Sequence, residues 1–246
     1  MRCMQLLTVV APVFAARCTL VVAEHGDCVV VDPGAGVAGA VADLVERHGL
    51  RPRALLATHG HVDHTWDAAV LSERFGVPFV LHAADTYRLG DPFGTLGVLG
   101  GRTSPHDPSG PLAQALAAAG VGPASYVEPG RVEAFGTGPG GRSDDVALAF
   151  GSVHLVARHA PGHTEGSTLY LLDVDGAGPV ALTGDVLFAG SIGRTDLPGG
   201  DDAEMGRTLR EVVATLVPGT VVVPGHGPTS DVATELATNP YLRAAV

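Results

Sequence analysis

The sequence predicts an α/β protein, and two observations lead to that prediction. Short strand-like runs alternate with amphipathic helical runs, an order typical of helices that cover the faces of sheets. Polar residues follow several of the apolar runs directly, and α/β folds place functional side chains at strand ends. The chain of 246 residues is long enough to bury a substantial core, although length alone allows either one large domain or two small ones.

The elements can be assigned along the chain from periodicity and turn signals. A turn at Gly26 separates the first two internal strands, and Gly49 is expected to end the first helix. The expected strands cover residues 18–23, 28–32, 53–57 and 78–82, then the runs "VALAFGSVHLVA", "STLYLLDV", "GPVALTGD" and "TVVVPGHGP". The expected helices cover residues 36–48, 66–75 and 202–216.

The opening stretch "MRCMQLLTVVAPVFAA" has the outline of a secretory signal, with one basic residue, a short apolar run and small residues. We interpret it as a core strand, because the next residues continue directly as a pair of strands. Cys3, Cys18 and Cys28 lack a Cys-x-x-Cys spacing and indicate neither a disulfide framework nor a thiolate metal site. No apolar run approaches the roughly 20 residues of a membrane span. We therefore expect a cytoplasmic protein without membrane partners.

Residues 90–145 form a Gly- and Pro-rich insertion between the better patterned parts. Thirteen of the 34 glycines lie in residues 90–141, broken only by the helical stretch "PLAQALAAAG". We expect a loop-rich insertion rather than a hydrophobic layer. Its arginines Arg102, Arg131 and Arg142 are candidate anion contacts, although solvated loop charges are the favoured interpretation.

The motif "THGHVDH", residues 58–64, follows a strand and concentrates ligating groups. In an extended segment residues two apart point the same way, so His59 and His61 can converge on one ion. Asp63 and His64 lie where the chain turns toward a helix, and are candidates to face a second ion. Burying so many ionisable groups without a metal would be costly. The motif therefore predicts a metal site.

Three further candidate ligands each end an apolar run: His163 in "HAPGHTEGS", Asp185 in "LTGD" and His226 in "VPGHGP". Imidazole and carboxylate ligands without thiolate suit zinc, iron or manganese. Two metals about 3.5–4 Å apart are typically bridged by a carboxylate and a water. Among the remaining histidines, His159 is a candidate to support the ligands. We interpret the others as structural: His25, His48, His82, His106 and His154.

In this order and spacing, "THGHVDH", "PGHT", "GD" and "PGHG" resemble the ligand motifs of the metallo-β-lactamase superfamily over essentially the whole chain. The resemblance implies a four-layer αββα sandwich, a single domain over residues 1–246, and metals at one edge of two facing sheets. It implies that His59, His61 and His163 hold a first metal. Asp63, His64 and His226 would hold the second, with Asp185 bridging both.

Within that superfamily, "LTGDVLFAGSIGRTDLPGGD" and "ATNPYL" resemble the glyoxalase II-related hydrolases. This implies thioester hydrolysis by a hydroxide that bridges two divalent metals, with zinc as the first expectation and iron or manganese as further candidates. The metals would lower the pKa of that water toward about 7, and the leaving thiolate needs little protonation. Only twenty residues follow His226, so we expect no counterpart of the helical domain that contributes glutathione contacts in the family. Glutathione specificity therefore does not carry over.

A rival interpretation is the persulfide dioxygenase branch, which shares the "GRTD" stretch. There one iron is held by two histidines and a carboxylate, which would map to His59, His163 and Asp185. The stretch "PGHGP" favours the hydrolase, because the dioxygenases resemble "PAHDY" at that place.

Lactonases, β-lactamases and nucleases of the superfamily match these residues less closely. Lactonases commonly carry a histidine where this chain has Ser167, and β-lactamases of the superfamily usually lack the bridging Asp185. Superfamily nucleases act on a polyanion, whereas this chain has a net charge of -11 and no lysine. A non-catalytic metal-binding scaffold predicts the loss of a ligand, and no ligand is missing.

The remaining predictions concern the surroundings of the metals. Asp63 is expected to be mainly a ligand and at most a proton carrier. Arg194 and Asp196 are interpreted either as a pair that fixes the loop near Asp185 or as a surface ion pair. Trp66 is interpreted as ordinary packing, or else as a wall of the pocket. The expected partner is a small-molecule thiol or thioester rather than nucleic acid, and the sequence predicts no oligomeric state.

Overall fold

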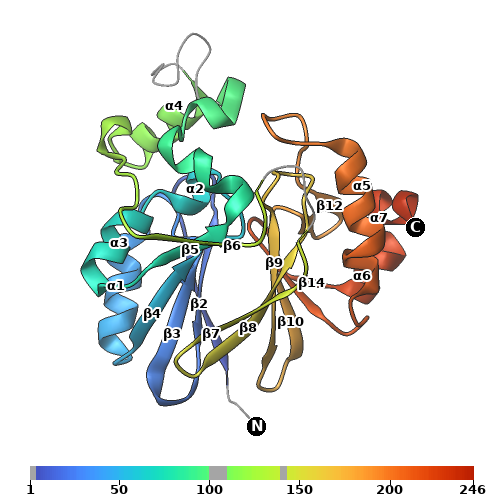
Figure 1. Cartoon of the computed structure of the whole chain (residues 1–246), viewed down its shortest axis with the longest axis horizontal. Helices are drawn as coiled ribbons and strands as arrows, with labels where there is room; N and C mark the ends of the chain where they lie inside the picture. Colours follow the sequence, from blue (N-terminus) through green and yellow to red (C-terminus); the bar gives the residue numbers. More distant parts are fainter. Residues whose placement is uncertain (1–3, 100–109, 139–142) are drawn as a thin grey trace.

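The computed structural model describes residues 4–99, 110–138 and 143–246, and two large sheets face each other in that part of the chain (Figure 1). Helices α1 and α3 lie on the outer side of the first sheet, and α5, α6 and α7 lie on the outer side of the second (Figure 1). The α/β fold class and the αββα order of layers are thereby confirmed. The helices of the described residues are α1 (Ala38–Arg47), α2 (Val62–Thr65), α3 (Ala68–Phe75), α4 (Pro111–Ala118), α5 (Asp202–Glu211), α6 (Val232–Thr238) and α7 (Pro240–Ala245).

The first sheet has the strand order β1-β2-β3-β4-β5-β6, antiparallel from β1 to β3 and parallel from β3 to β6. Its strands are β1 (Gln5–Val10), β2 (Arg17–Val22), β3 (Asp27–Val31), β4 (Arg51–Leu56), β5 (Phe79–His82) and β6 (Val132–Phe135). Side chains alternate between its faces, so Val29 and Val31 face the second sheet and Val30 faces the helices. Because both faces are covered, β3 is apolar throughout after Asp27.

The second sheet has the order β14-β13-β10-β9-β8-β7. Its strands are β7 (Val146–Phe150), β8 (Val153–His159), β9 (Thr168–Val174), β10 (Gly178–Gly184), β13 (Val221–Pro224) and β14 (Ser230–Asp231). β7 to β10 form an antiparallel meander, and β13 pairs parallel to β10. A short hairpin, β11 (Leu187–Phe188) with β12 (Ser191–Ile192), follows β10. The carboxyl ends of β8, β10 and β13 therefore meet at one edge of the sheet.

Most of the predicted elements are confirmed to within a few residues, with four differences. The run "VALAFGSVHLVA", predicted as one strand, is the antiparallel pair β7 and β8, which a turn at Gly151 and Ser152 separates. The helix predicted over 66–75 is α3, which begins at Ala68 because Asp67 is not helical, and the short helix α2 before it was not predicted. The helix predicted over 202–216 ends at Glu211 and continues as a 3-10 turn, η5 (Val213–Thr215). The opening stretch is a strand, but β1 lies at the edge of its sheet and is half exposed rather than a core strand.

The insertion over residues 90–145 differs more from the prediction. Its described part contains two 3-10 segments, η3 (Gly94–Leu99) and η4 (Pro123–Ser125), as well as α4 and β6. Phe93, Leu96, Leu112 and Leu116 are buried in a cluster that includes Trp66. The expectation of no hydrophobic layer is therefore wrong. The residues of this cluster are far apart in the sequence, so no local apolar run predicts it.

Two remaining predictions concern cysteines and membranes. Cys18 and Cys28 are buried free thiols, and Cys3 lies outside the described residues. Among the helices of the described residues, none combines the length and the apolar character that a bilayer crossing requires.

Candidate metal centre

The loop after β4 and the start of α2 carry the first four candidate ligands. The backbone there explains why His59 and His61 join one group and Asp63 and His64 another. His61 is extended at the N-cap position of α2, and His59 lies two residues earlier, in a bend after β4. Asp63 and His64 belong to the first turn of α2. This change from extended to helical backbone at His61 sends the two pairs of side chains to different places.

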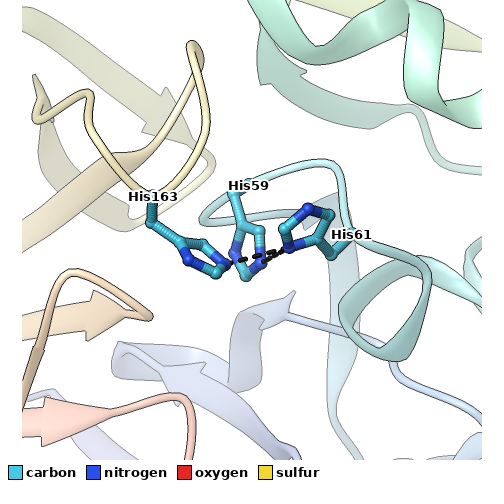
Figure 2. A group of neighbouring side chains, drawn as sticks. All are labelled: His59, His61 and His163. Carbon is cyan, nitrogen blue, oxygen red and sulfur yellow. Dashed lines mark hydrogen bonds between the residues drawn. The ribbon is translucent and has the colours of Figure 1, made fainter. Parts of the chain in front are cut away.

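His59, His61 and His163 form a first group of imidazoles (Figure 2). His61 Nδ1 lies 3.1 Å from His59 Nε2 and 2.9 Å from His163 Nε2. The three side chains are 1–3 % exposed. His163 comes from the loop after β8, so the two facing sheets both contribute to this group.

Hydrogen bonds behind two of these rings orient their nitrogen atoms. Thr58 donates its hydroxyl to Asp32 Oδ2 over 2.8 Å, which leaves a lone pair for the Nδ1–H of His59 at 3.2 Å. His163 donates Nδ1–H to the carbonyl of Arg194 over 2.7 Å. With Nδ1 carrying the proton, both rings present the Nε2 lone pair to the group, which is the form that ligates a metal.

Asp63, His64 and His226 form a second group. His226 Nε2 lies 3.2 Å from His64 Nε2 and 3.4 Å from Asp63 Oδ2. His226 donates Nδ1–H to the carbonyl of Phe14 over 2.9 Å, so its Nε2 faces the group. The His64 side chain is completely buried, whereas that of His226 is 25 % exposed. The second group therefore lies nearer the surface.

Asp185 lies between the two groups. Its Oδ2 is 3.7 Å from His163 Nε2 in the first group and 3.5 Å from His226 Nε2 in the second. Its Oδ1 is 3.4 Å from His64 Nε2 and is buried without a hydrogen-bond partner among the described residues. A Cβ on Gly225 would lie 2.3 Å from that oxygen, so the glycine before His226 is required by the close approach of Asp185.

Electrostatics differ between the groups. Burial lowers the pKa of His59 and of His61 well below the ordinary histidine value, so both rings are neutral at pH 7. Burial also acts to lower the pKa of His226, but hydrogen bonds to Asp185 and Asp63 outweigh it and raise that pKa to about 9. The carboxylates thus create a negative potential at the second group, which favours a bound cation.

These observations fit divalent metals. Imidazole nitrogens converge within hydrogen-bond distance of one another, and the carboxylate oxygen Asp185 Oδ1 is buried without a partner among the described residues. A cation would satisfy both features at once. The donors are nitrogen and oxygen, which suit zinc, iron or manganese.

The model of the metallo-β-lactamase superfamily matches residues 11–226. The chain belongs to this superfamily. An uncharacterized protein of Mycobacterium tuberculosis is 34 % identical over 94 % of this chain and 95 % of its own. A probable metallo-hydrolase of Bacillus subtilis, YqgX, is 32 % identical over 87 % of both chains. The hydroxyacylglutathione hydrolase GloC of Haemophilus influenzae is 26 % identical over 94 % of both.

Solved structures share the fold over most of the chain. The B3 metallo-β-lactamase BLEG-1 has a TM-score of 0.75 at 26 % identity, covering 97 % of this chain and 99 % of its own. TTHA1623 in a di-iron-bound form has a TM-score of 0.68 at 30 % identity, covering 96 % and 99 %. ETHE1 from Myxococcus xanthus has a TM-score of 0.64 at 23 % identity, covering 96 % and 84 %, and shows the fold alone.

The structure also places the predicted supporting residues of this superfamily member. Arg194 and Asp196 form an exposed two-pronged ion pair, and it is the carbonyl of Arg194, not its guanidinium, that contacts the candidate ligand His163. His159 is buried, donates to the Glu165 carbonyl over 2.8 Å and stacks on His82 with ring centroids 4.0 Å apart. His159 therefore holds the backbone two residues after His163.

Trp66, Ser167 and Arg131 lie outside the two groups. Trp66 is buried against Phe93 and Tyr126, which agrees with ordinary packing. Ser167 Oγ accepts from the backbone N–H of Thr164 and so closes the loop after His163. Arg131 forms an exposed ion pair with Glu133, as expected of a solvated loop charge. Arg102 and Arg142 lie outside the described residues.

Two carboxylates near the candidate ligands are not apparent from the sequence. Asp32 accepts from the backbone N–H of Thr58 over 2.7 Å, and its Oδ2 lies 3.1 Å from His64 Nδ1. It follows a strand, as the candidate ligands do, but "DPG" by itself indicates only a turn. Asp85 is completely buried beneath the first group and follows β5 in the 3-10 segment η2 (Ala83–Gly90). No spacing in the sequence connects Asp85 to the histidines.

Proposed function

We propose that this protein is a thioester hydrolase with two divalent metal ions. His59, His61 and His163 would hold the first metal, and Asp63, His64 and His226 the second. The position of Asp185 carries the proposal, because its oxygens lie within 3.7 Å of imidazole nitrogens from both groups. A carboxylate between two ligand sets is the arrangement of two-metal hydrolytic sites.

Zinc is our first expectation for the metals. The donor set also suits iron and manganese. The di-iron form of TTHA1623, at 30 % identity, supports iron as the main competitor.

A thioester is the substrate class that relatives and chemistry support together. The Haemophilus influenzae relative is a hydroxyacylglutathione hydrolase, and its match runs over 94 % of both chains. A thiol ionises near pH 8.5, so it leaves as a thiolate with little help from a general acid. A site whose central groups are metal ligands is therefore suited to a thiol leaving group.

The chain's own residues would prepare this reaction. Bound divalent metals would supply a polarised carbonyl and a water of lowered pKa. His59 and His61 are neutral because they are buried, so they can bind without first losing a proton. Asp63 Oδ2 lies 3.4 Å from His226 Nε2 at the more exposed side of the centre, where a carboxylate can also carry a proton away.

Metal analysis combined with two activity assays tests the proposal. Protein purified without oxygen should contain two divalent metals per chain and hydrolyse a hydroxyacyl thioester of glutathione or of a simpler thiol. A lactone serves as the competing hydrolytic substrate. One iron per chain with oxygen uptake on a glutathione persulfide would replace the hydrolase by a dioxygenase. Two metals with turnover of none of these substrates would favour a non-catalytic scaffold.

A further inference from the structure

Asp85 connects the two loops that carry the first group. Its side chain is 0 % exposed. Asp85 Oδ2 accepts from the backbone N–H of Gly60 over 2.8 Å and from the hydroxyl of Thr164 over 2.7 Å. Gly60 lies between His59 and His61, and Thr164 follows His163. One carboxylate oxygen therefore joins the loop after β4 to the loop after β8.

The other oxygen and the two glycines tighten this connection. Asp85 Oδ1 accepts from the backbone N–H of Gly166 over 2.8 Å. A Cβ on Gly166 would lie 2.6 Å from Asp85 Cγ, and a Cβ on Gly60 would lie 3.0 Å from Asp85 Cβ. Asp85 thus occupies space that both loops leave open by using glycine, with its carboxyl group against Gly166 and its Cβ against Gly60.

Arg88 compensates the buried carboxylate. Its side chain is also fully buried, and its Nε donates to Asp85 Oδ1 over 3.2 Å. Its Nη2 donates to Glu165 and, over 3.0 Å, to the carbonyl of Pro198. A buried charge pair with further hydrogen bonds on both partners holds its neighbours in one arrangement.

The second group is anchored differently. Arg17, at the start of β2, donates its backbone N–H to the Gly225 carbonyl over 2.7 Å and its Nε to the Pro224 carbonyl over 3.0 Å. These contacts hold the loop of His226 to the β1–β2 hairpin. The hydrogen bonds of Asp85, by contrast, go to the loops of His59, His61 and His163 and to Arg88.

We propose that Asp85 is a positioning residue for the first metal alone. It sets the distance between the His59–His61 loop and the His163 loop, and therefore the affinity of the first group for its metal. This inference rests on the proposed two-metal function.

Two single-site backgrounds separate the metals in the test. His226→Ala leaves the first group intact, and His163→Ala leaves the second. Asp85→Asn is placed in each background of the full chain, and zinc affinity is measured by competition with a chelator. The Nδ2 of asparagine would face the Gly60 or Gly166 N–H donors, so affinity should fall about 10- to 100-fold in the His226→Ala background. In the His163→Ala background it should change by less than about threefold.

Asp27→Asn is the matched control. Asp27 is a buried carboxylate at the start of β3, whereas the candidate metal centre lies beyond the carboxyl end of that strand, and it accepts hydrogen bonds from Arg53 and Ser152. It should change neither affinity. Gly166→Ala, which crowds the same carboxyl group, is the second variant should Asp85→Asn not fold, and it should give the same selective loss. Equal losses in both backgrounds, or no loss in either, would overturn the inference. Wild-type protein that binds no zinc would overturn the proposed function as well.

Discussion

The two halves of the candidate centre differ in how firmly the protein holds them. The first group is buried, hydrogen bonds fix the rings of His59 and His163, and Asp85 joins its two loops. The second group includes His226, which is a quarter exposed and is oriented by the carbonyl of Phe14. Phe14 has a φ of 53°, in the left-handed region that a bulky residue rarely adopts.

This difference indicates that the first group is preorganised and the second depends on a surface turn. Ligands locked by surrounding hydrogen bonds bind metal without reorganisation. We therefore expect the metal of the second group to exchange faster with solvent. Replacing single residues in and around each group tests this division.

Replacing Asp185 should have the largest effect, because it removes the group that both halves share. Asp185→Ala should weaken both metals and lower thioester hydrolysis by roughly 10³-fold or more, as expected when several kcal/mol of charge stabilisation are lost. Metal content and initial rates measure this. The control is Asp173→Ala, an exposed carboxylate on β9, which should leave both unchanged. Full activity in Asp185→Ala would mean that the halves work independently.

Replacing His226 should remove metal binding from the second group alone. His226→Ala is expected to reduce the metal content from two per chain to about one and to lower hydrolysis by on the order of 10²-fold. Metal analysis of the purified variant checks this, with the exposed His48→Ala as the control. Retention of one iron and of oxygen uptake would instead support the mononuclear dioxygenase.

Asp32 should affect the two halves together, because it contacts Thr58 behind His59 and also lies beside His64. Asp32→Asn should weaken both metals by about 10- to 100-fold. Asparagine is chosen because Asp32 has a φ of 56°, which asparagine tolerates better than bulkier or branched residues do. Chelator competition on wild type and variant measures the loss. A loss confined to one metal would show that Asp32 belongs to one half only.

Asp27 lies outside both halves, and its replacement should change stability but not metal binding. Burial acts to raise the pKa of Asp27, but hydrogen bonds from Ser152 and Arg53 outweigh it and lower the pKa from 3.8 to about 2. A depressed carboxyl pKa stabilises the fold above the unfolded value of 3.8, and this stabilisation is lost as the pH falls toward 2.

Asp27→Asn should therefore lower the free energy of unfolding by about 1–2 kcal/mol at pH 7. The difference from wild type should shrink between pH 4 and about pH 2, which urea unfolding at several pH values measures. A constant difference across that range would show that the low pKa of Asp27 does not contribute to stability. A change in metal affinity would contradict the separation of Asp27 from the metal centre.

The strands and the histidines could be predicted from sequence because their signals are local. Residues 58–64 carry a dense motif, and β4, β8, β10 and β13 are apolar runs that end beside a candidate ligand or a few residues before one. β6 gives no such signal, since Val132 to Phe135 are mostly exposed and the strand depends on pairing with β5. α6 and α7 are too short for a clear helical period and could not be predicted either.

The supporting carboxylates Asp32 and Asp85 could not be predicted for a different reason. Asp85 is 25 residues from Gly60 and 81 residues from Gly166, and only the fold brings them together. A lone Asp in a sequence has no feature that distinguishes it from a surface charge. Tertiary contacts, rather than residue types, give these two carboxylates their importance: Asp32 contacts Thr58 and His64 after the neighbouring strand β4, and Asp85 joins loops of the two sheets.

The orientation of His163 by the carbonyl of Arg194, and of His226 by the carbonyl of Phe14, has a consequence for mutational scanning. A carbonyl belongs to the main chain, so alanine at position 14 or 194 supplies the same acceptor as the native residue, whereas proline cannot adopt the φ of 53° at position 14. Alanine scanning should score both positions as tolerant, whereas deleting one residue from either loop should disturb the ring that it aims. Insertion and deletion libraries, rather than substitution libraries, would therefore reveal what these two loops do.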